Sequence, residues 1–453
     1  MFYRVIVSAL CFSFSFFVMP ASIILMPASF ILIFGALLEN KLTFKLGFLW
    51  GCIVYTVQIL PLLSIAYLTS TVISQIIPRV LVWLIMVIYT AFYAGLWFFF
   101  MQLSTARITH FVYKLCPAVL ISLIFFTWLD LMFLWPFGLL EGYACIYPLV
   151  PLVYFLPSYV FFSGKSFVLF ILLLFCSGII SLSFMHKKSA LGGVFLVCYA
   201  LIIMRTSSQV LQEQAPAWLK HVIRISPPWV FEPEKYSWVS ARALGNLIEQ
   251  ALTHNIHAEL IIFPESAFQY ELNKYPEVLA YWQTISERSD SPDIGLIIGA
   301  HRRVGSHVYN SCYYIAQGAI KNYYDKQHGL LWLERVPSWS RYITCADICV
   351  ERHRLFAQSE QARELFNWKD ISFIPFICSD NFFSPKHDNY VGRKQIMLCL
   401  INDAWCRHSF LPQILYATVY LQARCTGLPV LYVSHTRGIF IDHEQREFEL
   451  PFF

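Results

Sequence analysis

Charged residues are scarce in this chain, and the scarcity is confined to one half of it. Only 13% of the 453 residues are Asp, Glu, Lys or Arg, against about 25% in ordinary soluble domains. Residues 1–205 contain ten Lys or Arg and three Asp or Glu, whereas residues 206–453 hold the other 23 and 25. The net charge of +5 therefore comes from the first half. A basic surface that would bind nucleic acid is not indicated.

The cysteines form no metal-binding pattern. The 13 cysteines are scattered, and no Cys-x-x-Cys or Cys/His pair has the spacing of zinc ligands. Cys345 and Cys349 are four residues apart, but no second pair follows them. We therefore expect no metal and no cofactor. The sequence leaves open whether these two cysteines or Cys425 form disulfides.

Long apolar runs fill the first half of the chain. About 20 apolar residues cross a bilayer as a helix. Seven such segments are predicted, near residues 4–19, 22–38, 46–68, 79–102, 116–135, 166–185 and 189–204. Prolines interrupt the stretch 136–165, which is expected to fold at the outer membrane surface or to re-enter the membrane. We predict a membrane domain over 1–205, a linker over 206–216 and a second, soluble domain over 217–453.

The loops between the predicted spans indicate their orientation. With the amino terminus in the cytoplasm, the inside segments carry seven Lys or Arg and the short outside segments carry two. Cytoplasmic loops are the ones enriched in positive charge. After seven spans, the chain from about residue 206 emerges on the opposite side. We therefore expect a multi-pass protein of a bacterial inner membrane, with its soluble domain in the periplasm.

The second half alternates apolar strands with helical segments. Strands are predicted at 221–225, 258–263, 295–300, 308–315, 320–324, 371–377, 395–401 and 429–434. Helical spacing is found over 237–254 and over about 410–425. The strand–helix–strand steps at the start of this half favour a layered α/β domain, and its middle strands look antiparallel.

Three side chains of chemical interest each follow one of these strands. Glu265, Lys326 and Cys378 come at or just beyond a strand end, which is where open α/β sheets place their chemistry. Each also has an ordinary explanation. Glu265 would then be a solvated loop residue, Lys326 a surface ion-pair partner of Asp325, and Cys378 a buried thiol. The threefold repetition of the arrangement favours a catalytic site.

The order and spacing of these residues resemble the Glu-Lys-Cys triad of the nitrilase superfamily. The intervals are 61 and 52 residues. Because a membrane domain precedes the triad, nearly the whole chain resembles the apolipoprotein N-acyltransferase family. The supporting motifs are Leu-Gly-Phe-Leu-Trp-Gly at 46–51, Trp-Pro-Phe-Gly at 135–138, Phe-Pro-Glu-Ser at 263–266, Tyr-Asp-Lys-Gln-His at 324–328, Asn-Asp-Ala-Trp at 402–405 and Gly-Leu-Pro at 427–429.

This resemblance implies a fold and a reaction. The fold would be a multi-pass α-helical membrane domain followed by an α/β nitrilase-type domain, an αββα sandwich. Cys378 would attack a phospholipid ester and form a thioester, and the α-amine of a diacylglyceryl-cysteine lipoprotein would then accept the acyl chain. A thiol is mostly protonated near neutral pH, so Glu265 is the expected base. Lys326 would stabilise the negatively charged carbonyl oxygen.

Other residues are expected to support the triad. Glu334 and Asp380 would orient the lysine or the glutamate, and the backbone N–H of Ser379 would assist at the carbonyl oxygen. His328 and Asp403 are expected to be structural. The apolar run 329–333, which follows the lysine closely, would be either a lid that contacts the acyl chain or a core strand.

The sequence departs from the family in several places. It has Cys-Ser-Asp at 378–380, where the family has Cys-Tyr/Phe-Glu, and Trp-Leu-Glu-Arg at 332–335, where the family has Phe-Gly-Glu-Tyr. The strand at 223–226 lacks the family's Val-Gln-Gly-Asn, and we expect no closing transmembrane helix after the soluble domain. Two alternatives therefore remain open. One is a membrane-anchored carbon–nitrogen hydrolase, or a relative of the TraB proteins of conjugal plasmids, with a different acceptor; the other is a non-enzymatic membrane scaffold.

Overall fold

The structure is a computed structural model, and its chain divides into two compact units. The first unit consists mostly of the residues up to Val210, and the second mostly of those from Leu211 onward. The described residues are 2–17, 19–69, 73–108, 110–131, 165–185, 215–227, 237–254, 257–288, 294–317, 319–329, 334, 356–357, 359, 363–382, 394–404, 411–444 and 446–451.

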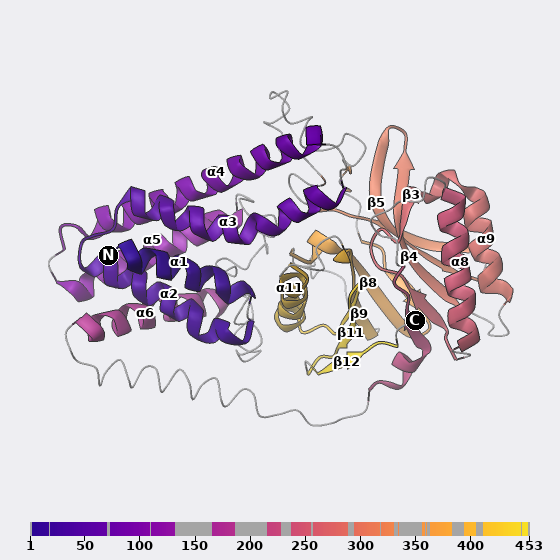
Figure 1. The fold of residues 1–453 in the computed structure, drawn as a ribbon. Helices are drawn as coiled ribbons and strands as arrows, with labels where there is room; N and C mark the ends of the chain where they lie inside the picture. Colours follow the sequence, from indigo (N-terminus) through magenta and orange to yellow (C-terminus); the bar gives the residue numbers. More distant parts are fainter. Residues whose placement is uncertain are drawn as a thin grey trace. The chain divides into compact units, whose positions relative to one another are not determined.

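Helices make up the described part of the first unit (Figure 1). They are α1 (Phe2–Phe17), α2 (Met19–Leu38), α3 (Phe44–Thr69), α4 (Ile73–Thr105), α5 (Phe111–Leu131) and α6 (Lys165–Met185). These helices coincide with six of the seven predicted apolar segments. The seventh segment, 189–204, lies outside the described residues, as does nearly all of the proline-interrupted stretch.

Length and apolar composition decide which of these helices could cross a membrane. Among the described residues, only Val87–Thr105 of α4 is both long and apolar enough to cross a membrane by length and composition. Shorter apolar helical stretches are found at Phe2–Phe16, Ile24–Leu38, Tyr113–Phe126 and Ile171–Ser181. The seven crossings therefore stay a prediction.

Small residues allow α3 and α4 to approach closely. A Cβ atom added at Gly47 would lie 2.5 Å from the carbonyl oxygen of Ala94, and one added at Gly51 would lie 2.6 Å from Cα of Ala91. Spacing of small residues by four positions is a common way to bring helices together in a bilayer. Next to this contact, Nε1 of Trp50 donates to the hydroxyl of Ser8 at 3.1 Å, so the polar edge of this buried indole is paired.

Two six-stranded sheets form the centre of the second unit. The first sheet contains β1 (Val222–Arg224), β2 (Leu260–Ile262), β3 (Phe268–Glu271), β4 (Gly295–Val304), β5 (His307–Ala316) and β6 (Ala319–Asp325). The second contains β7 (Phe366–Trp368), β8 (Ile371–Ile377), β9 (Lys394–Ile401), β10 (Val430–Ser434), β11 (Gly438–Ile441) and β12 (Glu447–Glu449). The first sheet has the order β1-β2-β4-β5-β6, with β3 paired to β4, and the second has the order β12-β11-β10-β9-β8-β7.

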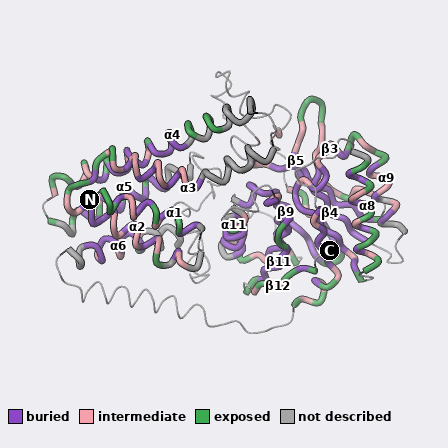
Figure 2. The backbone as a smooth tube through the Cα atoms, in the orientation of Figure 1, coloured by how far each residue is buried: buried purple, intermediate pink, exposed green. Residues whose placement is uncertain are grey.

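Helices and sheets are stacked in layers (Figure 1). Helices α8 (Ser237–His254) and α9 (Pro276–Arg288) cover one face of the first sheet, where residues such as Ile261, Phe263 and Trp282 share one buried cluster. On the other face, Tyr314 of β5 stacks on Phe366 of β7, with ring centroids 5.8 Å apart. Helix α11 (Leu411–Thr426) contacts the second sheet through Thr426. The predicted layered α/β architecture of this half is confirmed, and its strands are largely buried (Figure 2).

Strand direction agrees with the sequence, but several elements were missed. β1, β2 and β4 are parallel, whereas β4–β5 and β5–β6 are antiparallel, which confirms the predicted antiparallel middle strands. The unpredicted elements are β3, β7, β11, β12 and α9. Most of them are strands of three or four residues, too short for a periodic pattern to stand out. Helix α9 did have a readable spacing, in Val278, Trp282 and Ile285.

Candidate active site

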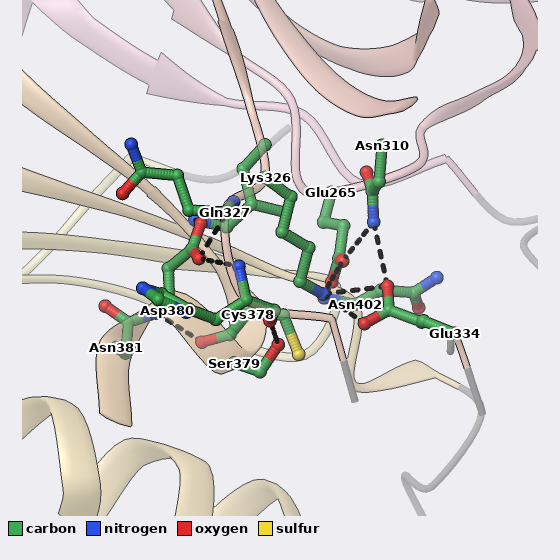
Figure 3. A network of polar contacts seen from close by, with 12 residues as sticks. Glu265, Asn310, Lys326, Gln327, Glu334, Cys378, Ser379, Asp380, Asn381 and Asn402 are labelled. Atoms are coloured by element: carbon green, nitrogen blue, oxygen red, sulfur yellow. Dashed lines mark hydrogen bonds and ion pairs between the residues drawn. The ribbon is translucent and has the colours of Figure 1, made fainter. Parts of the chain in front are cut away.

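The three residues singled out in the sequence converge at the ends of strands. β2 and β6 run in the same direction, because β5 lies antiparallel to both β4 and β6 while β2 is parallel to β4. Glu265 and Lys326 therefore leave the first sheet at the same edge. Cys378 begins the short helix that directly follows β8 of the second sheet. Figure 3 shows the three side chains beside one another.

A tight contact between strands fixes the turn that carries Glu265. Pro264 follows two residues after the end of β2, and Ser266 has a positive φ of 53°. On the neighbouring strand β4, a Cβ atom added at Gly299 would lie 2.4 Å from the carbonyl oxygen of Pro264 and 2.8 Å from Cα of Glu265. Only glycine leaves room for this turn, so Gly299 sets the position of the glutamate.

Cys378 occupies a strained position at its strand end. Its φ is 46°, a left-handed conformation that is costly for a residue with a side chain. Asn381 donates its side-chain amide to the carbonyl of Cys378 at 2.8 Å, and Gln422 of α11 donates to the carbonyl of Asn381 at 2.8 Å. Strain of this kind is typical of functional sites that the surrounding structure holds in place.

Lys326 forms the centre of a buried ionic cluster. Its Nζ lies 3.1 Å from Oε1 of Glu265 and 2.8 Å from the carboxylate of Glu334. Only 2% of the Lys326 side chain and 5% of the Glu265 side chain are exposed. The ordinary alternative for Lys326, a surface ion pair with Asp325, does not hold, because Arg302 binds Asp325. Lys326 faces the site.

Two asparagines complete the surroundings of Glu265. Asn402 begins the Asn-Asp-Ala-Trp motif at 402–405, but neither asparagine was predicted to belong to the site. Nδ2 of Asn310, from the middle of β5, donates to Oε1 of Glu265 at 2.7 Å and to Oε1 of Glu334 at 3.1 Å. The backbone N–H of Asn402, just beyond β9, donates to Oε2 of Glu265 at 2.8 Å. Both oxygens of Glu265 are thus held (Figure 3).

The charges in this cluster assign different roles to the glutamate and the lysine. Burial raises the pKa of Glu265; the charge of Lys326 opposes this, and that of Glu334 adds to it. Burial alone would lower the pKa of Lys326, but Glu265, Glu334 and Cys378 more than offset it and hold that pKa well above its ordinary value. The lysine therefore stays a cation at neutral pH, and the glutamate is the group whose protonation can change.

Asp380 and Ser379 join the cysteine turn to the turn after Lys326. Asp380 is fully buried and accepts hydrogen bonds from the hydroxyl of Tyr324 at 2.8 Å and from the backbone N–H groups of Gln327 and His328 at 3.2 and 2.8 Å. The hydroxyl of Ser379 donates to the carbonyl of His328. Asp380 thus acts on the backbone around the lysine, whereas its expected contact was with a side chain of the triad.

The remaining sequence expectations can also be located. Glu334 lies beside Lys326, as expected. His328 contributes backbone groups, and Asp403 accepts a hydrogen bond from the backbone N–H of Thr436 at 3.1 Å, which agrees with structural roles. The run 329–333 lies outside the described residues beyond its first glycine, so the choice between lid and core strand stays open.

The site offers a thiol, a carboxyl group of raised pKa and a fixed cation. Among the described residues, no group of three or more His, Cys, Asp or Glu side chains could hold a metal ion. A thiol beside a base and a cation suits attack on a carbonyl carbon, with the cation placed for the oxygen that becomes negative.

Comparison with known proteins finds likeness in structure alone. No family model and no curated protein matches the sequence. The structure is similar to a carbon–nitrogen hydrolase from Helicobacter pylori, with 13% identity and a TM-score of 0.36 over 51% of this chain and 85% of that chain. An amidase from Nesterenkonia sp. is 12% identical, with a TM-score of 0.35 over 54% of this chain and 90% of that chain. A glutamine-dependent NAD+ synthetase from Acinetobacter baumannii is 16% identical, with a TM-score of 0.33 over 48% of this chain and 40% of that chain. The neighbours include members of the nitrilase superfamily.

Proposed function

We propose that this protein is a cysteine-dependent acyltransferase of the carbon–nitrogen hydrolase type. It would move a fatty acyl chain from a phospholipid, through a thioester on Cys378, to the α-amine of a diacylglyceryl-cysteine lipoprotein. The observation that carries the proposal is the buried contact between Lys326 and Glu265 beside a cysteine with a positive φ. The lipid substrates rest on the resemblance of the sequence to the apolipoprotein N-acyltransferase family.

In the first half-reaction, Glu265 takes the thiol proton as sulfur attacks the ester carbonyl of the phospholipid. The carbonyl oxygen becomes negative, and the ammonium of Lys326 stabilises it together with the backbone N–H of Ser379. The ester C–O bond then breaks. The leaving lysophospholipid oxygen receives the proton from Glu265, and a fatty acyl thioester remains on Cys378.

In the second half-reaction, the amine of the lipoprotein attacks the thioester carbonyl. Glu265 accepts a proton from the nitrogen, the C–S bond breaks, and the proton returns to the thiolate. The product is an amide. The raised pKa of Glu265 suits both halves, because a base works best when its pKa lies near the operating pH.

The surface of the first unit supports a membrane location. Large apolar side chains of α4 are exposed along much of its length, from Val80 through Ile88 and Phe92 to Leu103. Exposed positions along this helix are coloured green in Figure 2. This interval would extend about 35 Å along a helix, close to the thickness of a bilayer core. We propose that lipid covers this face and that the chemistry takes place on the periplasmic side of a bacterial inner membrane.

The Cys-Ser-Asp motif supports a second candidate, a membrane-anchored carbon–nitrogen hydrolase or a TraB-like protein. Asp380 replaces the family's glutamate and is fully engaged with Tyr324 and backbone N–H groups. It is therefore not directed at an acceptor. In this candidate, water or another nucleophile attacks the acyl-enzyme, and the triad is used in the same way.

Mass spectrometry of the purified full-length protein after incubation with mixed phospholipids tests both candidates. We expect a fatty acyl mass on the Cys378 peptide that hydroxylamine removes, and no such adduct in Cys378→Ala. Adding a diacylglyceryl-cysteine lipopeptide should discharge the adduct to an amide; free fatty acid instead would favour the hydrolase. If Cys378 reacts with iodoacetamide but acquires no acyl group from any phospholipid, lipid acyl transfer is refuted.

Labelling of intact cells tests the orientation. A single cysteine introduced within 206–216 should react with a membrane-impermeant thiol reagent. Protection of this cysteine until the membrane is permeabilised would place the catalytic domain in the cytoplasm and overturn the proposed location.

A further inference from the structure

A histidine from the second sheet contacts the backbone of Glu265. His435 directly follows β10, and its Nε2 lies 3.3 Å from the carbonyl oxygen of Glu265. On the other side of the ring, Nδ1 lies 3.3 Å from the hydroxyl of Ser226, just beyond β1. The ring therefore links the ends of β10, β1 and β2.

The ring is uncharged at neutral pH, so one of its two nitrogens carries a hydrogen and the other does not. Burial lowers the pKa of His435 to about 4, and the nearby charge of Arg224 acts in the same direction. The carbonyl oxygen of Glu265 can only accept. This contact is therefore a hydrogen bond when Nε2 carries the hydrogen. The hydroxyl of Ser226 donates to the carbonyl of His435 at 2.9 Å, and a backbone hydrogen bond with Pro227 also acts on the ring.

The carbonyl oxygen that His435 contacts belongs to the Glu265 turn, whose position Gly299 also restricts from the neighbouring strand β4. The Glu265 carboxylate is already held by Lys326 Nζ at 3.1 Å and the N–H of Asn402 at 2.8 Å. Those bonds fix the tip of the side chain, and His435 fixes its backbone origin. Both ends of the Glu265 side chain are therefore held by hydrogen-bond contacts.

We propose that His435 is a positioning residue for Glu265, acting by donating its Nε2 hydrogen to the Glu265 carbonyl. The inference rests on the proposed role of Glu265 as the base. A displacement of about 1 Å at a reacting group typically costs about a hundredfold in rate. We therefore expect loss of this hydrogen bond to slow proton removal from Cys378 without altering the binding of lipid.

Two amide substitutions separate the hydrogen bond from the volume of the ring. The amide of His435→Gln can reach the position of Nε2 and donate to the Glu265 carbonyl. That of His435→Asn is one carbon shorter, so it can replace only Nδ1. The smaller volume of the asparagine side chain would show as a lower melting temperature, whereas loss of the hydrogen bond alone would slow the reaction and leave the melting temperature unchanged.

The experiment is the pH profile of Cys378 alkylation by iodoacetamide, an uncharged reagent that needs the thiolate but no lipid. The full-length protein and its variants would be compared by peptide mass spectrometry, with thermal unfolding as the folding control. We expect His435→Gln to react like the wild type. We expect His435→Asn to react about 10- to 100-fold more slowly at neutral pH, with an unchanged melting temperature and an unchanged KM for phospholipid.

Each outcome either supports or overturns the inference. Equal rates for His435→Asn and the wild type, or an equal loss in both variants, would refute a positioning role. A third variant, Glu265→Gln, distinguishes this failure from failure of the proposed function. If Glu265→Gln reacts at the wild-type rate, Glu265 is not the base; if it is slowed while His435→Asn is not, only the inference about His435 falls.

Discussion

Replacing Gly299 by alanine should disable the site with one added methyl group. The new Cβ would lie 2.4 Å from the carbonyl oxygen of Pro264, whereas ordinary contacts of this kind begin at 3.4 Å. The obstructing atoms belong to the backbone, so they cannot rotate away, and the Glu265 turn must move by about 1 Å. A shift of that size costs about 10²-fold in rate.

The same substitution should leave the protein folded. Overpacking of a core costs about 1–3 kcal/mol, and replacing a strand glycine by alanine returns about 0.5–1 kcal/mol. The net loss is small against a typical stability of about 5–15 kcal/mol. The predicted signature is therefore a large loss of rate with a modest fall in melting temperature.

A matched control lies on the same strand. A Cβ atom at Gly295 would meet the terminal Cδ1 of Leu260 at 2.9 Å, and Leu260 can adjust by rotation. The assay is single-turnover acylation of Cys378, followed by mass spectrometry, for both alanine variants. Gly295→Ala should acylate at close to the wild-type rate. A Gly299→Ala protein that also acylates at the wild-type rate would show that the position of Glu265 does not limit the reaction.

Three further substitutions test the electrostatics and the support of the site. Lys326→Ala should slow thioester formation about 10²–10³-fold with lipid binding unchanged, and an unaltered rate would remove its role. Asp380→Ala should lower the free energy of unfolding by about 3 kcal/mol, while Asp380→Asn should lose less; chemical denaturation measures both, and equal losses would contradict this. Burial and the charge of Glu334 raise the pKa of Glu265. The acylation rate, which increases as Glu265 loses its proton, should therefore increase at a higher pH than it would with an exposed glutamate. Glu334→Gln should move this rise to lower pH, and an unmoved pH–rate profile would count against the coupling.

The sequence predicted the three triad residues because each of them follows the end of an apolar strand. Apolar runs locate buried strands without an alignment, so a polar residue that ends such a run, such as Cys378, can be selected directly. Asn310 could not be found in this way, because it lies in the middle of β5 and only the pairing of β5 with β6 brings it to the cluster. The contact of His435 with Glu265 joins residues 170 positions apart, and no local pattern predicts it.

The environment of a residue was harder to predict than its location. Lys326 was selected as a site residue, and the ordinary alternative for it was a surface ion pair with the adjacent Asp325. In the structure, Asp325 pairs with Arg302, and the side chain of Lys326 points into the site. Sequence neighbours point to opposite faces of a strand, so adjacency is poor evidence for an ion pair where a strand ends.

The chain completes one sheet before it begins the other, and each sheet supplies only part of the triad. Glu265 and Lys326 come from residues before Glu334, and Cys378 from residues after Phe356, whose backbone N–H donates to the carbonyl of Glu334 at 3.0 Å. If the chain were expressed as two fragments divided between Glu334 and Phe356, neither fragment alone would form the thioester. Reassembly of the two fragments would restore thioester formation. A split at this point would therefore suit a complementation reporter, because its signal would require the two sheets to associate.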